Sequence, residues 1–235
     1  MADGIYVGMA GAAARAAQLD SIADNLANAE TPGFKAARPA FASVLAGRGP
    51  TDKVFSAAVA TGTDLRPGMS VATDNPLDVM PEGDLFLGVQ TGSGQVAFTR
   101  NGKIEVGPEG QLQILGHPVL GRSGSPISVP PGVAPTIDES GQVMVDGSTV
   151  DTIALYRVQG AMDRGGQALL TAATGATVEA VEGNLKVGAL EMGNAPALES
   201  AVQMIGAQRH FETAMQAIQT YKKLDERATE VGRIR

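Results

Sequence analysis

The chain has 235 residues, of which 43% are hydrophobic and 18% charged, and it carries a formal net charge of −7 without any cysteine or tryptophan. The lack of cysteine excludes disulfides and thiolate metal sites, and the scattered lysines and arginines argue against nucleic acid as the main partner. No run approaches the roughly 20 apolar residues of a transmembrane helix, and no charged start with a long apolar run indicates a cleaved signal peptide, so these features alone predict a cytoplasmic protein.

The first element expected along the chain is a helix over residues 4–28. Small or apolar residues recur there at alternating steps of four and three, which is the pattern of a coiled-coil seam. The seam consists of Ile5, Met9, Ala12, Ala16, Leu19, Ala23 and Leu26. Its alanines bury little area, so we expect the helix to depend on partners for its order. The alternative is an ordinary amphipathic helix that packs on its own domain.

The helix is expected to end in a tight turn within residues 25–35. Asn28 can cap the end of the helix, and Pro32 cannot continue it. Pro32 and Gly33 fit the two central positions of a type II turn, where glycine supplies the positive φ angle. Phe34 follows directly as a large apolar side chain. The segment therefore predicts a helix end, a turn and an apolar anchor.

The middle of the chain is expected to be rich in strands. Residues 36–75 are interrupted by glycine and proline and predict a connecting region with short strands. Residues 76–147 show the clearest β pattern, in which Asn101 and Gly102 form a favoured two-residue hairpin turn. Residues 152–158 predict a further strand.

A weak internal repeat lies within this β-rich region. Residues 106–116 align with residues 137–147, and residues 94–98 look like a partial third copy. Each copy has a turn that closes on Gly-Gln before an alternating strand, which indicates one type of hairpin reused across an antiparallel sheet or small barrel. The unequal spacings argue against a solenoid.

A second long helix is expected over residues 198–232. Apolar residues lie along one broad face of it, with some drift in register, and they include Val202, Ile205, Phe211, Met215, Ile218, Tyr221 and Leu224. Such a stripe is typical of a helix that packs against another helix. The simplest interpretation is core packing, which is compatible with a role in an interface between chains.

The sequence offers no convincing catalytic or metal-binding constellation. His117 and His210 are the only histidines, and neither has an acidic residue at the spacing of a metal site. Residues 92–97 match a dinucleotide-binding fingerprint, but they lead into a predicted hairpin where the fingerprint needs a helix. We therefore expect no enzymatic activity, no cofactor, no metal and no small-molecule substrate. The alternative is a hydrolase whose acid and base come from distant positions and leave no motif.

Several segments together resemble the bacterial flagellar rod and hook protein family. The family's N-terminal signature is matched by Asn25, Leu26, Ala27, Asn28, Thr31, Gly33, Phe34 and Lys35. Other similar segments are 75–79, 83–84, 99–102, 188–191, 204–205, 208–209 and 211–212. Residues 110–112, 116–121, 126–130 and Phe211 look most like the proximal rod members, and the distal rod members are similar over much of this region. Residues 192–196 depart from the Ser-Asn-Val-Asn that is usual in the family.

The resemblance implies an α+β fold. In it, long N- and C-terminal α-helices pack as a coiled-coil-like pair, and the centre is an antiparallel β-rich domain. The domains implied are a helical axial core of residues 1–35 plus 190–235, a connecting region of residues 36–75 and a β-rich outer domain of residues 76–189.

The resemblance also implies a structural subunit of the flagellar basal-body rod, most similar to the proximal rod, that self-assembles in the periplasmic space and transmits torque for motility. Its partners would be other copies of itself, other rod and hook axial proteins, and the flagellar type III export apparatus, which would export it without a cleaved signal peptide. No nucleic acid and no membrane insertion are expected. The assembly interface would contain Ile5, Met9, Ala12, Ala16, Leu19, Ala23, Leu26, Asn28, Phe34, Val202, Ile205, Phe211, Met215 and Ile218. The alternatives are a distal rod or hook-like axial subunit, or a secreted β-rich adhesin with a coiled-coil stalk.

Overall fold

The structure is a computed structural model, and it describes residues 2–45, 54–130 and 132–233. The chain forms two compact units. The first, which we call the helical unit, consists of Met1–Ala27, Ala37–Gly62 and Ala197–Arg235. The second, which we call the β unit, consists of Asn28–Ala36 and Thr63–Pro196. Each unit is therefore assembled from segments that are far apart in the sequence.

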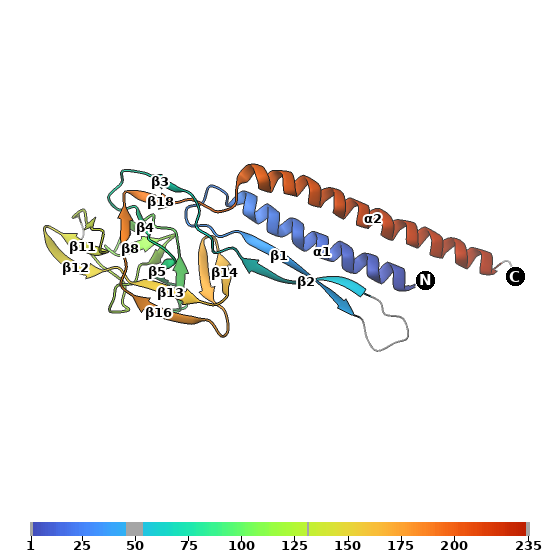
Figure 1. The fold of residues 1–235 in the computed structure, drawn as a ribbon, viewed down its shortest axis with the longest axis horizontal. Helices are drawn as coiled ribbons and strands as arrows, with labels where there is room; N and C mark the ends of the chain where they lie inside the picture. Colours follow the sequence, from blue (N-terminus) through green and yellow to red (C-terminus); the bar gives the residue numbers. More distant parts are fainter. Residues whose placement is uncertain (1, 46–53, 131, 234–235) are drawn as a thin grey trace. The chain divides into compact units, whose positions relative to one another are not determined.

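The helical unit contains two long helices and a β-hairpin. Helices α1 (Ala2–Ala27) and α2 (Ala197–Arg233) lie side by side, and the hairpin of β1 (Ala37–Leu45) and β2 (Val54–Thr63) packs along α1 (Figure 1). Helix α1 is rich in alanine, the residue with the highest helix propensity. Helix α2 begins directly after Pro196 and carries Glu199 in its first turn. A negative charge there interacts favourably with the helix dipole and stabilises the helix. Neither helix, over its described residues, is both long enough and apolar enough to cross a membrane.

The expected fold class needs a correction. We expected the two helices to pack as a coiled-coil-like pair with a central antiparallel β-rich domain, and residues 36–75 to be a connecting region. Instead, the β1–β2 hairpin belongs to the same compact unit as the helices and packs on α1. Because α1 is covered by α2 on one side and by β1 on another, its buried residues cannot follow the single stripe of a two-helix coiled coil.

The burial of individual α1 residues shows how the predicted seam is displaced. Met9 is 54% exposed and Ala23 is exposed, although both were expected in the seam. Ile22, which was not, is only 4% exposed. Gly8 lies so close to α2 that a Cβ atom there would come within 2.8 Å of the Cγ1 atom of Ile218. The expected seam is therefore displaced by one residue at Met9 and at Ala23.

The β unit is built from small antiparallel sheets. Its strands are β3 (Ser70–Ala72), β4 (Val79–Pro81), β5 (Leu85–Gln90), β6 (Val96–Thr99), β7 (Glu105–Val106), β8 (Leu112–Ile114), β9 (His117–Pro118), β10 (Thr136–Ile137), β11 (Gln142–Val145), β12 (Ser148–Thr152), β13 (Leu155–Gln159), β14 (Met162–Gly166), β15 (Leu169–Ala172), β16 (Thr177–Val181), β17 (Leu185–Val187) and β18 (Ala189–Glu191). Six of them form the main sheet, in the order β14-β15-β6-β5-β13-β16. Buried residues of the main sheet and of the smaller sheets beside it make one core, which includes Val79, Leu87, Val89, Leu112, Ile114, Val119 and Val143, all 0% exposed.

The predicted internal repeat corresponds to one turn that the β unit uses three times. In each copy the backbone N–H of the first turn residue donates to the carbonyl of the glutamine, at Gln95 (2.9 Å), Gln111 (2.8 Å) and Gln142 (3.1 Å). The preceding glycine has a φ angle of 77–79° in all three copies. Only glycine adopts this conformation without strain, which explains the recurring Gly-Gln pair.

The predicted two-residue hairpin at Asn101 and Gly102 is wrong. A type I′ turn needs a positive φ at both central residues, and neither residue has one. Asn101 is instead 2% exposed, and a Cβ atom at Gly102 would collide with the carbonyl oxygen of Val79. The glycine is therefore needed for close approach between backbones and not for a turn.

Candidate assembly interface

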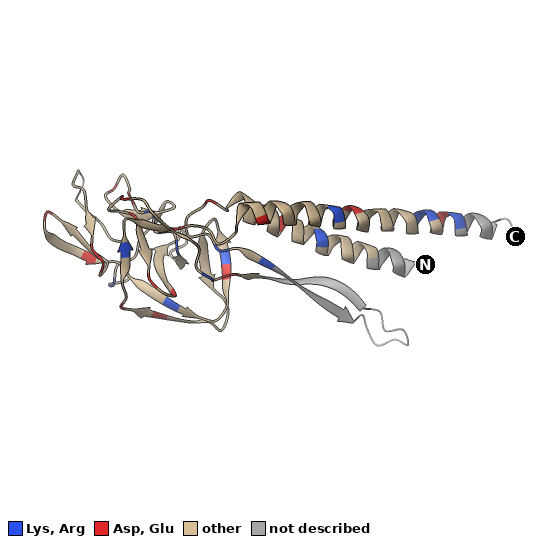
Figure 2. Ribbon diagram, turned by 45° about the horizontal axis from the view of Figure 1, so that its top comes forward, with Lys and Arg blue, Asp and Glu red and all other residues tan. Residues whose placement is uncertain are grey.

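Helix α2 exposes a stripe of large apolar side chains. Leu198, Val202 and Ile205 are 80%, 63% and 54% exposed, and their spacing places them on one face of the helix. The opposite face contains Ser200 and Ala207, which are 5% and 3% exposed and lie on the side packed against α1. Charged residues are sparse along α1 and the first part of α2 and gather toward the C-terminal end of α2 (Figure 2). An apolar stripe of this kind is typical of a surface that binds another protein.

The structure divides the residues expected at the interface into buried and exposed sets. In α1, Ala12 is buried, Ala16, Leu19 and Leu26 are half-buried, and Met9 and Ala23 are exposed, whereas the side chain of Ile5 lies outside the described residues. In α2, Phe211 and Ile218 are half-buried on the side of α1, while Met215 is 39% exposed along with Val202 and Ile205. Sequence reasoning missed Leu198, although it precedes Val202 by one helical turn.

Asn25 joins the end of α1 to the start of the β1–β2 hairpin. Its side-chain Nδ2 donates to the carbonyl of Ala37 at 2.9 Å, and its Oδ1 accepts from the N–H of Ala37 at 2.7 Å. The residue is 8% exposed, so both polar groups of its amide are satisfied away from water. Asn25 therefore holds the hairpin on α1 inside the helical unit.

The turn expected at residues 31–34 is confirmed, and it is buried in the β unit. The N–H of Phe34 donates to the carbonyl of Thr31 at 3.2 Å, and Gly33 has a φ of 69°, as in a type II turn. Phe34 is 0% exposed, packs with Ala36 and Ala195, and has the guanidinium of Arg164 4.8 Å from its ring centre. Asn28, also expected at the interface, lies half-buried at the start of this turn and accepts from the N–H of Thr31.

Asn194 cross-links the segments around this turn. Its Oδ1 accepts from the N–H of Ala36 at 2.7 Å. Its Nδ2 donates to the carbonyls of Asp64 at 2.7 Å and Arg66 at 2.8 Å. The residue lies in the 192–196 segment that departs from the usual family pattern. The segment nevertheless retains an asparagine that fixes the N-terminal turn to the C-terminal part of the β unit.

Three buried charged residues tie the same region together. Glu191 accepts from Lys35 Nζ at 2.6 Å and from Arg100 Nε at 2.8 Å, and the three side chains are 1%, 1% and 5% exposed. Lys35 Nζ also donates to the carbonyl of Arg66 at 2.7 Å, and the N–H of Gly68 donates to Glu191 Oε1 at 3.0 Å. Because all of these groups are paired, the cluster is well placed to hold its segments together, and removing one member would leave a buried charge without compensation.

The protonation of the cluster follows from its pairing. Burial alone would raise the pKa of the Glu191 carboxyl, but the charge of Arg100 and the hydrogen bond from Lys35 outweigh it, so the pKa lies below its usual value. Burial lowers the pKa of the Lys35 ammonium, because desolvation outweighs its contacts with Glu191. Sequence reasoning did not identify this cluster. A signal for these three residues was present, since each lies in a segment that resembles the rod and hook protein family.

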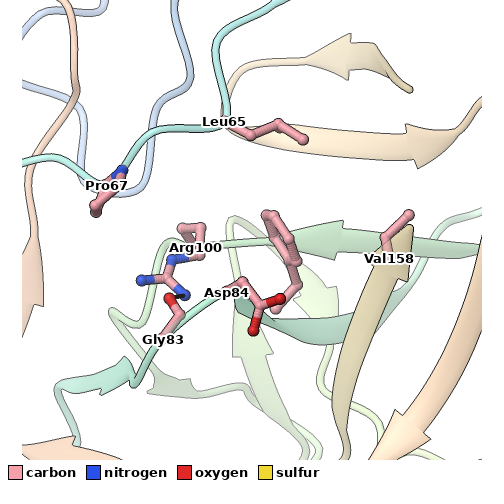
Figure 3. A pocket seen from close by; sticks show the side chains of 7 residues that line it. Leu65, Pro67, Gly83, Asp84, Arg100 and Val158 are labelled. Carbon is pink, nitrogen blue, oxygen red and sulfur yellow. Dashed lines mark hydrogen bonds between the residues drawn. The ribbon is translucent and has the colours of Figure 1, made fainter. Parts of the chain in front are cut away.

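A cavity of about 330 Å³ opens beside Arg100 (Figure 3). Its walls are Leu65, Pro67, Gly83, Asp84, Phe86, Arg100 and Val158. Arg100 is already engaged by Glu191, and Asp84 pairs with Arg157 at 3.3 Å. Within the described part of the chain, no group of three acidic or histidine residues could hold a metal ion. His117 lies half-buried in β9 and His210 is exposed on α2.

Comparisons with known proteins agree with the features at both ends of the chain. The family model described as flagella basal body rod protein matches residues 5–35, and the model described as flagellar basal body rod FlgEFG protein C-terminal matches residues 186–231. The chain is 37% identical to the flagellar basal-body rod protein FlgF of Escherichia coli strain K12, over 91% of this chain and 92% of that protein. It is 34% identical to FlgF of Salmonella typhimurium strain LT2, over 97% of each chain. It is also 30% identical to the rod protein FlgG of Caulobacter vibrioides, over 89% of this chain and 92% of that protein.

Proposed function

The chain belongs to the family of flagellar basal-body rod proteins, and from this we propose that it is an axial subunit that builds the proximal part of the rod by assembling with its neighbours. The observation that carries the proposal is the exposed apolar stripe of Leu198, Val202 and Ile205 on α2. These side chains lie in water in the monomer, and covering them with another chain lowers the free energy.

We infer that the two units make different contacts in the assembled rod. We assign the axial contacts to α1 and α2, and the outer contacts to the β-rich residues 76–189. The rod interface then includes the exposed members of the predicted set, Met9, Ala23, Val202, Ile205 and Met215. The half-buried members stabilise the subunit and complete the interface at its edges.

Assembly supplies much of the order of the helical unit in this proposal. The buried hydrophobic residues that the structure describes in this unit are Ala12, Ala14, Ile22, Ala37 and Ala207. Only one of them is larger than alanine, so the described part of this unit buries little apolar area, and we infer low local stability for the free helices. Contacts with neighbouring subunits would order the helices and provide the stiffness that transmits torque.

Partners follow from the same proposal. They are further copies of this chain and other rod and hook axial proteins, and the subunit reaches them through the flagellar type III export apparatus without cleavage. The role is structural and needs no catalytic residue, cofactor or small-molecule substrate. The similarity to FlgG supports a second candidate, a distal rod subunit. The two differ in whether the chain forms a short segment or polymerises without limit.

The experiment that tests the proposal is the isolation of basal bodies from the bacterium that encodes this chain, with the chain carrying a small epitope tag. We expect the tag in the rod fraction, and we expect deletion of the gene to abolish motility and rod completion. A chain that is absent from intact basal bodies, or a deletion strain with complete rods, would contradict the proposal. The length of the labelled rod segment separates the proximal from the distal assignment.

A further inference from the structure

We propose that the outward stripe of α2 in one copy of this chain packs against the outward face of α1 in a second copy, with Arg209 beside Asp20. The inference rests on the proposed function and adds which surfaces of the helical unit meet. The α2 stripe consists of Leu198, Val202, Ile205 and, one turn later, Arg209, which is also exposed.

The outward face of α1 is complementary to this stripe in size. Its exposed residues are Met9, Ala13, Ala17, Asp20, Ala23 and Ala27, at spacings that keep them on one side of the helix. Four of the six are alanines, which let another helix approach closely. The three large side chains of α2 can therefore pack over the small side chains of α1, as ridges pack into grooves.

The two surfaces are also complementary in charge. Among the described side chains of the α1 face, Asp20 is the exposed charged residue, and Arg209 is the charged residue nearest the centre of the α2 stripe, with Glu212 at its edge. Asp20 and Arg209 have no ion pair or side-chain hydrogen bond with any part of the chain that the structure describes. An acid and a base left unpaired on two apolar faces favour contact between those faces and fix their register.

A single copy cannot make this contact with itself. Within the helical unit, α1 and α2 pack through other residues, such as Gly8 against Ile218 and the side of α2 that holds Ala207. Both outward faces remain free in each copy. Because the two faces differ, the contact between copies is heterologous and leaves one unused face at each end, so it can be repeated along an assembly.

Cysteine cross-linking in the assembled rod tests the contact directly, since the chain contains no cysteine of its own. The double variant D20C/R209C would be expressed from the native locus, and isolated basal bodies would be oxidised and separated without reductant. We expect dimers and higher oligomers of the chain. The matched control is D20C/K222C, because Lys222 is exposed but lies roughly 140° around the helix from Arg209 at 3.6 residues per turn.

The result separates this inference from the proposed function. Labelled chain in basal bodies that forms no more oligomers with D20C/R209C than with D20C/K222C, or that closes the disulfide within one copy, would overturn the inference and leave the rod assignment intact. Chain missing from basal bodies when unmodified would overturn the rod assignment itself.

Charge reversal provides an independent readout of the same contact. We expect D20R and R209D each to lower the amount of chain in isolated rods about tenfold, because each places like charges together. The combined variant D20R/R209D should restore at least half of the wild-type amount, since it restores opposite charges. Equal loss in the single and combined variants would contradict the pairing, and so would wild-type incorporation of both single variants.

Discussion

Glu191 connects three segments of the β unit that are distant in the sequence. Its carboxylate accepts from Lys35 after the N-terminal turn and from Arg100 after β6, while its own backbone carbonyl accepts from the N–H of Gly33 at 2.7 Å. The residue ends β18, from which the chain continues toward α2. One buried residue therefore joins, within the β unit, the segment that follows α1 to the segment that precedes α2.

Removing this charge should destabilise the β unit strongly. E191Q preserves the shape of the side chain but leaves Lys35 and Arg100 as buried positive charges, and we expect a loss of roughly 3–5 kcal/mol in the free energy of unfolding. Urea denaturation of the purified chain measures this loss. The control is E105Q, which breaks the exposed pair of Lys103 and Glu105 and should cost less than about 1 kcal/mol. A similar small cost for both variants would contradict the role of the cluster.

The free energy of unfolding should depend on pH through the ionisation of Glu191. The pKa of Glu191 is lower in the folded chain than its usual value, so the unfolded chain binds the proton more readily. The stabilisation is therefore present above the unfolded pKa of about 4.3 and is lost as pH falls through the folded pKa. We expect the stability advantage of the wild type over E191Q, measured by urea denaturation at successive pH values, to shrink below about pH 4. An advantage that stays constant down to pH 2 would be inconsistent with this assignment.

Asn25 offers a residue-level test in the helical unit. N25A would leave both the N–H and the carbonyl of Ala37 without their partner, at a cost of about 1–3 kcal/mol. N25D would keep the acceptor for the N–H but would place a carboxylate oxygen against the Ala37 carbonyl at a buried site, so its effect should be at least as large. Amide hydrogen exchange at residues 37–38 measures the loosening. Equal exchange in N25A and the wild type would show that the contact contributes little.

At the scale of whole elements, α2 has one face for its own subunit and another for partners. Phe211 and Ile218 lie half-buried toward α1, whereas Val202 and Ile205 lie in the exposed stripe. From the sequence they formed one broad apolar face, because periodicity identifies which residues are apolar and not which partner covers them. The same limit applies to α1, where the hairpin β1–β2 covers a second side that the sequence did not reveal.

The two faces of the helical unit should respond differently to a charge. V202D alters a side chain that is 63% exposed, so the free subunit should lose less than about 1 kcal/mol of stability while incorporation into rods is blocked. L19D alters a half-buried side chain and should both block incorporation and weaken the helical unit, with the β unit still folded. Rod incorporation and circular dichroism of each purified variant measure the two effects. Normal incorporation of V202D would argue against the exposed stripe as an interface.

At the scale of the whole molecule, the sequence predicted the elements with local signals. These are the helix over α1, the helix over α2, the type II turn at Gly33 and the Gly-Gln turns of the repeat. Contacts between distant segments were not predictable in the same way, since the glycines and prolines of residues 36–75 concealed a long hairpin. The Lys35–Glu191 pair depends on the folded β unit and has no local pattern of its own.

The molecule also differs in how strongly its two units are held together. The β unit has a continuous apolar core with several fully buried large side chains, such as Leu87 and Ile114. The helical unit buries little besides alanine and Ile22 among its described residues. We therefore infer that the β unit folds stably in the free chain, whereas the helices gain most of their stability from neighbouring subunits.

The most direct measurement of this claim is amide hydrogen exchange on the chain in two states, as a purified monomer and within isolated basal bodies. We expect residues 2–27 and 197–233 to exchange at least about tenfold faster than β5 and β13 in the monomer, and to become protected in the assembled rod. Helices that are as well protected as these strands in the free chain, or helices that gain no protection on assembly, would contradict the account.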